Sequence, residues 1–224
     1  MDIVSYLLGK NAGGGGGNLD EYFNTEITKN TTIDTPAQVV KKTPDINVAD
    51  NVTNLTGAFK GATFSPKVIM GNNVTNCSYM FYQVSVSSLD VSTLNTENVT
   101  DMSNMFYGCE QLETLDVSNF DVAKVTNFSN MFGACVKLTE LDLSSFHTKT
   151  NAFFTSMFYY CTSLTRLDIR NFDFTNAFTG SMFGNSASDG VPNNCLIIVK
   201  DDDTKTLLQN SFSRLTNIKT VAEL

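Results

Sequence analysis

A segment of sixteen residues recurs along this chain at a fixed interval. Residues 105–120 read MFYGCEQLETLDVSNF, residues 131–146 read MFGACVKLTELDLSSF and residues 157–172 read MFYYCTSLTRLDIRNF. The starting positions 105, 131 and 157 are equally spaced, and we call this spacing one period. A single unit of this length is too short to bury a core of its own, whereas stacked copies can share one. The period therefore predicts a stack of similar coils.

The repeat extends beyond these three copies in weaker form. A fourth tetrad of the LDVS type begins at Leu89, again one period before the next at Leu115. Met-Phe pairs begin at Met80 and Met182 as well, and Ala58 starts a degenerate first copy. We expect about six units, with the outer ones irregular.

Each unit contains two hydrophobic patterns. In LETLDVSNF, Leu115 and Val117 share one face while Asp116 and Ser118 share the other, as a strand requires. In the segment that follows, apolar residues occur at spacings typical of one or two helical turns. They are Val125, Phe128, Met131, Phe132 and Cys135. The predicted fold class is therefore an α/β repeat, a leucine-rich-repeat solenoid of about six units, each a strand, a turn and a short helix.

Three cysteines also recur at intervals of one period, which raises the question of a metal site. The position three residues after each Phe of the Met-Phe or Ala-Phe pair is occupied in turn by Ala62, Val84, Cys109, Cys135, Cys161 and Ser186. A position that accepts these residue types is a small packed slot, where a free Cys acts as a buried hydrophobe. Cys77 replaces larger core residues of other units. We expect no metal site and no cofactor.

Polar residues of the tetrads form the candidate binding face. The aspartates of the four tetrads should align on the exposed strand face about 5 Å apart, where like charges repel by about 1 kcal/mol or less. Each Asp could bond backbone or hydroxyl groups of a neighbouring turn, or the column could bind a cation or another ligand. The residues beside it vary, as either a recognition surface or an unconstrained surface would. The candidate face comprises Ser88, Asp90, Thr114, Asp116, Ser118, Glu140, Asp142, Ser144, Arg166, Asp168 and Arg170.

The two ends differ from the repeats, which we place at residues 50–194. Residues 195–224 predict a C-terminal cap: a buried strand over residues 196–199, a helix with Asp203 as N-cap and a final short strand at NIKTV. The apolar stripe of that helix is Leu207, Leu208, Phe212 and Leu215. At the other end we expect a short attachment segment over residues 1–12, a glycine linker over 13–17 and an irregular N-terminal cover over 18–49.

Composition excludes several classes of function. The net charge of −8 argues against binding to nucleic acid or to an anionic membrane through a basic surface. No apolar run is long enough for a membrane insertion, and MDIVSYLLGK lacks the features of a signal peptide. The single histidine, His147, falls in a variable turn rather than beside a nucleophile. We therefore expect a protein that is not an enzyme.

The unit CxxLxxLDVSxFxxxxVTxxSxMF resembles that of the BspA-like leucine-rich-repeat surface proteins. The matching positions are Cys109, Leu112, Leu115, Asp116, Val117, Ser118, Phe120, Val125, Thr126, Ser129, Met131 and Phe132. The resemblance covers roughly residues 50–190 and implies a curved, noncatalytic solenoid that binds host proteins or surfaces.

The two ends add a second resemblance. LIIVKDDDTKTLLQ near the C-terminus is similar to the closing segment of such proteins encoded by bacteriophages and gut bacteria, and the N-terminus resembles that of phage tail or virion structural proteins. These likenesses imply a recognition module on a phage tail or virion that contacts a host protein or glycan, with residues 1–12 joining a virion partner. The alternative is a bacterial BspA-like adhesin. The expected location is a virion or a cell surface.

Overall fold

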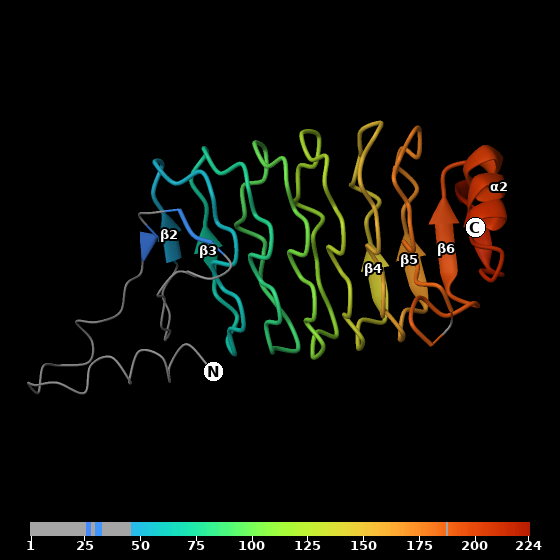
Figure 1. Cartoon of the computed structure of the whole chain (residues 1–224), viewed down its shortest axis with the longest axis horizontal. Helices are drawn as coiled ribbons and strands as arrows, with labels where there is room; N and C mark the ends of the chain where they lie inside the picture. Colours follow the sequence, from blue (N-terminus) through green and yellow to red (C-terminus); the bar gives the residue numbers. More distant parts are fainter. Residues whose placement is uncertain (1–25, 28–29, 33–45, 187) are drawn as a thin grey trace, which may run out of the picture.

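The computed structural model describes residues 26–27, 30–32, 46–186 and 188–224. The predicted attachment segment and glycine linker lie outside these residues, as does most of the predicted N-terminal cover. The described chain forms an elongated row of coils, each beside the next, with β2 (Ile46–Val48) near one end of the row and α2 (Asp202–Ser211) at the other (Figure 1).

One side of the row carries the strands, which all run parallel. The first sheet has the order β1 (Glu26–Ile27), β2 (Ile46–Val48) and β3 (Val68–Ile69), and the second has the order β4 (Glu140–Asp142), β5 (Arg166–Asp168), β6 (Leu196–Val199) and β7 (Ile218–Thr220). Strand β2 lies in the range expected to be irregular, and that part of the prediction is wrong. It pairs in parallel with β3, so the row of strands begins before the recognisable repeats.

The register between β4 and β5 follows the sequence period. Leu141 pairs with Leu167, one period later, and an isolated parallel bridge joins Ser88 to Thr114 at the same interval. Leu89, Leu115, Leu141 and Leu167 are all buried. Equivalent side chains therefore form columns, although membership of the leucine-rich-repeat class itself stays a prediction.

The segments expected to be short helices are runs of turns instead. Between residues 128 and 135, Met131 N–H donates to Phe128 O at 3.0 Å, three residues back, whereas Phe132 N–H donates to Met157 O of the next coil at 3.0 Å. Asn130 and Ala134 have φ of 57° and 58°, which a right-handed helix cannot contain. The apolar spacing of three residues matches these three-residue turns as well as it matches a helix, which is why the pattern misleads. We call this second set of coil-to-coil hydrogen bonds the turn ladder.

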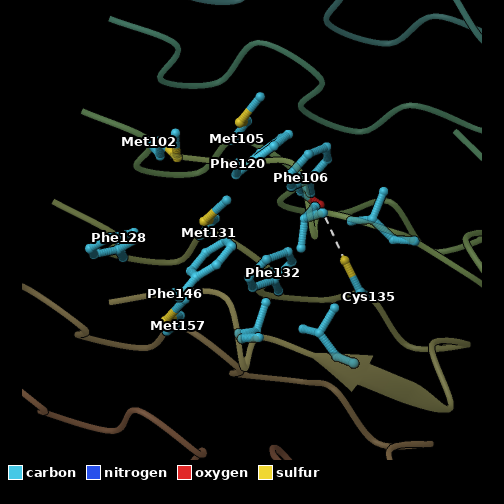
Figure 2. Packing of buried hydrophobic residues seen from close by; sticks show 14 of the residues in the cluster. Met102, Met105, Phe106, Phe120, Phe128, Met131, Phe132, Cys135, Phe146 and Met157 are labelled. Atoms are coloured by element: carbon cyan, nitrogen blue, oxygen red, sulfur yellow. Dashed lines mark hydrogen bonds between the residues drawn. The ribbon is translucent and has the colours of Figure 1, made fainter. Parts of the chain in front are cut away.

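The core lies between the strands and the turn ladder. One phenylalanine per coil stacks on the next, with ring centroids 5.5–6.0 Å apart. This column consists of Phe59, Phe81, Phe106, Phe132, Phe158 and Phe183. Methionines beside it are fully buried, as Figure 2 shows around Met105 and Met131. Burial of a phenylalanine contributes about 1.5–3 kcal/mol, so repetition along the row supplies much of the stability.

The C-terminal end is closed by helix α2 (Asp202–Ser211), strand β7 and a short 3-10 helix, η2 (Val221–Glu223). The N-cap is Asp201, whose Oδ1 accepts a hydrogen bond from Thr204 N–H at 3.0 Å, and the assignment to Asp203 is wrong. Asp201 is the extended residue, whereas Asp203 lies in the first turn, where negative charge is favoured. Leu208 is buried as the apolar stripe predicted, but Leu207 is 45% exposed, so its place in that stripe is wrong.

Arg214 ties this cap to the last coil. Its guanidinium donates hydrogen bonds to the backbone carbonyls of Val191, Phe183 and Gly184. Phe183 O also accepts a hydrogen bond from Val191 N–H, and the one side chain of Arg214 adds a donor for each of the three carbonyls at the junction. No helix of the described residues is both long enough and apolar enough to cross a membrane.

Candidate functional site

The outward side chains of the strands form the candidate site, which we call the front face. Parallel pairing places Glu140 beside Arg166 and Asp142 beside Asp168, and the bridge between Ser88 and Thr114 does the same in earlier coils. The strands thus bring residues one period apart into contact.

The exposed aspartates of this face make the same local hydrogen bond. Asp90, Asp116 and Asp142 each accept, through Oδ1, a bond from the backbone N–H two residues ahead, at 3.0, 2.9 and 2.8 Å. Each carboxylate therefore closes the turn that follows its own strand. Of the two alternatives, the bond to backbone or hydroxyl groups is made within the turn that directly follows rather than to a neighbouring coil, and binding of a cation or another ligand by the column stays a prediction.

These hydrogen bonds favour the charged carboxylates. The hydroxyl and backbone N–H of Ser92 lower the pKa of Asp90, and the corresponding groups of Ser118 lower the pKa of Asp116. Partial burial acts to raise the pKa of Asp142, but bonds from Ser144 and the nearby arginines outweigh it and leave the pKa lowered. The front face therefore carries negative charge over the whole neutral range.

Asp168 departs from the prediction because it is fully buried. Its carboxylate forms ion pairs with Arg170 and, at 3.5 Å, with Arg166. On the next strand the paired residue is Ile198, which belongs to the apolar strand under the cap. Asp168 is thus a structural anchor, and the exposed acidic column ends one coil earlier.

Two adjoining depressions run along the front face. One, of about 290 Å³, lies around Ser88 and Asp90, and the other, of about 620 Å³, extends to Glu140 and Arg166. They share Thr114, Asp116 and Ser118, so we treat them as one groove, the front groove. Its predicted members are Ser88, Asp90, Thr114, Asp116, Ser118, Glu140, Asp142, Ser144 and Arg166.

Arg170 does not join this groove. It lines a separate depression of about 690 Å³ with His147, Lys200 and residues of α2. Conversely, Glu113 and Thr139 line the front groove and were not predicted. Both precede the leucine of their tetrad by two positions, and they lie one period apart, so the repeat itself could have indicated them.

The recurring cysteines lie in the core. All five are buried and free, and Cys135 donates a weak thiol hydrogen bond to Phe106 O at 3.3 Å (Figure 2). Burial raises the pKa of Cys109 and of Cys161 to about 12, which makes the thiolate scarce. Ser186 does not occupy the equivalent slot: it is exposed, and Val191, whose N–H donates to Phe183 O, takes the place after an intervening loop. Among the described residues, no cluster of three or more His, Cys, Asp or Glu side chains could hold a metal ion.

Residues 75–191 match a family model described as "Mycoplasma protein of unknown function, DUF285". The chain belongs to the DUF285 family. The match covers the regular coils and the whole front groove, and the association with phages stays a prediction. Comparisons with curated proteins and with solved structures gave no match.

Proposed function

We propose that this DUF285 protein is a noncatalytic recognition module whose front groove binds a protein partner on a host surface. The observation that carries the proposal is that the acidic charge of the groove exceeds what the fold needs. In the turn ladder the same bond to the N–H two residues ahead is accepted by neutral residues, such as Asn54 at 2.8 Å and Asn127 at 3.1 Å. Asparagine would therefore satisfy the turn, and a column of aspartates that repel one another needs another reason.

The charge distribution indicates the chemistry of the partner. Glu113, Asp116, Glu140 and Asp142 line the larger depression, and Arg166 lies at its C-terminal end. An acidic groove attracts basic groups and accelerates their encounter, and this attraction weakens with salt. A protein segment with Lys or Arg side chains fits this surface better than a neutral glycan does.

A peptide library selected on the intact protein tests this proposal without knowledge of the natural partner. Enrichment of Lys- and Arg-rich peptides is expected, with affinity that falls as salt rises. Glu140→Lys should weaken the selected peptides by about tenfold or more, whereas Glu110→Lys, the same change outside the groove, should not. Equal affinity for both variants would contradict the proposal. Arg166 is left unchanged because it contacts buried Asp168.

The placement of the module on a phage tail or virion is the finer part of the proposal, and a bacterial adhesin is its alternative. It is supported by the resemblance of the N-terminal residues to virion proteins. Deletion of residues 1–17 should leave the coils folded but remove the protein from purified virions. Incorporation of the truncated protein would reject attachment through this segment.

A further inference from the structure

The outward side of the turn ladder, which we call the back face, is almost free of charge. It is formed by the outward side chains within residues 54–61, 76–83, 101–108, 127–134, 153–160 and 178–183. Among these residues Lys60 and Asp101 are the only charged ones, although the chain has 15 basic and 23 acidic residues. The remaining outward positions are mostly Tyr, Ser, Asn and Gly. This composition is also typical of the binding loops of antibodies.

Every tyrosine that the structure describes lies on this face. Tyr82 stacks on Tyr107 with ring centroids 5.5 Å apart, and Tyr159 meets Tyr160 edge-on at 4.6 Å. Tyr79 and Tyr160 have φ of 56° and 58°, a left-handed conformation that is unfavourable for a bulky residue. Several other coils place Gly or Asn at these positions, so the tyrosines are present at a conformational cost.

Two exposed phenylalanines also depart from the residue types that the earlier coils have on this face. Phe153 and Phe178 stand in the column in which earlier coils have Asn54, Asn76, Asp101 and Asn127. Those earlier residues accept a bond from the N–H two residues ahead, and a phenyl ring cannot. Phe153 and Phe178 instead stack at 4.5 Å and remain 43% and 54% exposed. At these two positions the side-chain hydrogen bond that closes the turn in earlier coils is lost, and an aromatic ring is exposed to solvent instead.

We propose that two copies of this chain associate through their back faces, with Phe153 and Phe178, in the last two coils of the face, as the main apolar contact. A chain with a net charge of −8 repels a second copy, so stable self-association needs a surface where acidic groups do not meet. The back face meets this need, and the front groove does not. Six coils spaced about 4.8 Å apart give a face about 25 Å long, the scale of an interface that buries about 800 Å² per partner.

The stacking of the rings favours a protein surface over a sugar. The ring of Tyr107 lies between Tyr82 and Gly133, where a Cβ would come within 2.8 Å of its Cδ2 atom. Tyr82 thus covers one face of this ring, and Gly133 lies against it as well. Sugars stack on open aromatic faces, whereas edges and hydroxyl groups pack well against another protein.

A back-to-back dimer would leave both front grooves free on opposite sides. If the groove binds a host protein as proposed, the dimer would bind a dense surface more tightly than one copy, through avidity. The dimer itself does not depend on what the groove binds.

Sedimentation velocity of the full chain over a range of concentrations tests the dimer. The wild-type protein should sediment as a dimer, and a monomer at every accessible concentration overturns the proposal, whatever other partner the face has. Phe153→Asn with Phe178→Asn should produce a monomer, raising the dissociation constant by about a hundredfold or more. A double variant that remains dimeric also overturns it.

The chain supplies controls that separate loss of contact from loss of fold. Both substitutions restore a residue that earlier coils use, so at protein concentrations too low for either protein to dimerise the variant should unfold at the same or a higher denaturant concentration. Tyr160→Gly, which restores the Gly of earlier coils at a position with positive φ, should also weaken the dimer. Leu207→Gln, at a side chain of similar exposure on α2, should leave the dimer unchanged.

Discussion

The front and back faces of this protein solve the same structural problem with different residues. Both close a turn in several coils by a side-chain oxygen that accepts the N–H two residues ahead, for example Asp116 on the front and Asn127 on the back. The front uses charged carboxylates and the back uses mainly neutral amides. The comparison teaches that a neutral acceptor closes the turn as well as a charged one, so the charge of the front and the aromatic rings of the back are additions to the fold.

The largest effect should come from the core that the two faces share. Phe132→Ala, from the turn ladder, and Leu141→Ala, from β4, each remove a fully or nearly fully buried side chain. We expect a loss of about 3–5 kcal/mol for the first and about 2–5 kcal/mol for the second in urea unfolding. Each variant should loosen both faces, as measured by hydrogen exchange. A variant that loosens only its own face would show that the faces are independent.

A smaller but still large effect should separate Asp168 from the exposed aspartates of the front face. Arg170→Ala removes the guanidinium from the buried carboxylate of Asp168, which keeps Arg166 at 3.5 Å and the backbone N–H of residue 170 at 3.3 Å, and should cost about 2–4 kcal/mol. Asp142→Ala, one coil earlier and exposed, should cost about 1 kcal/mol or less. Equal losses in thermal or urea unfolding would mean that Asp168 is not the anchor that its burial indicates.

The repeat predicted which residues align from coil to coil, but it did not predict how buried each of those residues is. Leu115 is buried and Asp116 is exposed, as alternation on a strand required, and the front groove gathers most of the predicted residues. The burial of Asp168 could not be read from the repeat, because it depends on the arginines of that coil and on the cap beside it.

The turn ladder shows a different limit of prediction. A three-residue apolar spacing suits both a helix and a series of turns, and only the left-handed residues, such as Asn130, decide between them. The Asn before two of the Met-Phe pairs, Asn104 and Asn130, was a signal of such residues, because Asn adopts positive φ more readily than most. The exposure of Phe153 could not be predicted from an apolar side chain, since hydrophobic residues normally indicate core.

The buried position that holds Cys109, Cys135 and Cys161 lies in the core between the two faces. A substitution there tests how tightly this core is packed. Cys135→Ala should cost about 1–2 kcal/mol, because it removes a small buried side chain and its contact with Phe106 O. The native protein should react slowly with thiol reagents, since burial raises the pKa of Cys77 to about 12. Rapid native-state labelling, or loss of bound metal in the variant, would contradict the packing role.

The smallest predicted effect tests the comparison of the faces directly. Asp116→Asn keeps an oxygen for Ser118 N–H and should change stability at neutral pH by a few tenths of a kcal/mol, whereas Asp116→Ala should cost about 1 kcal/mol. Because the folded pKa of Asp116 is lowered, its contribution is present above the unfolded pKa of about 3.9 and is lost as the pH falls through the folded pKa. The Asn variant should therefore lose less stability in acid than the wild type. Asn127→Asp on the back should be equally well tolerated, and a large penalty there would show that the two faces differ in the fold itself and not only in what they bind.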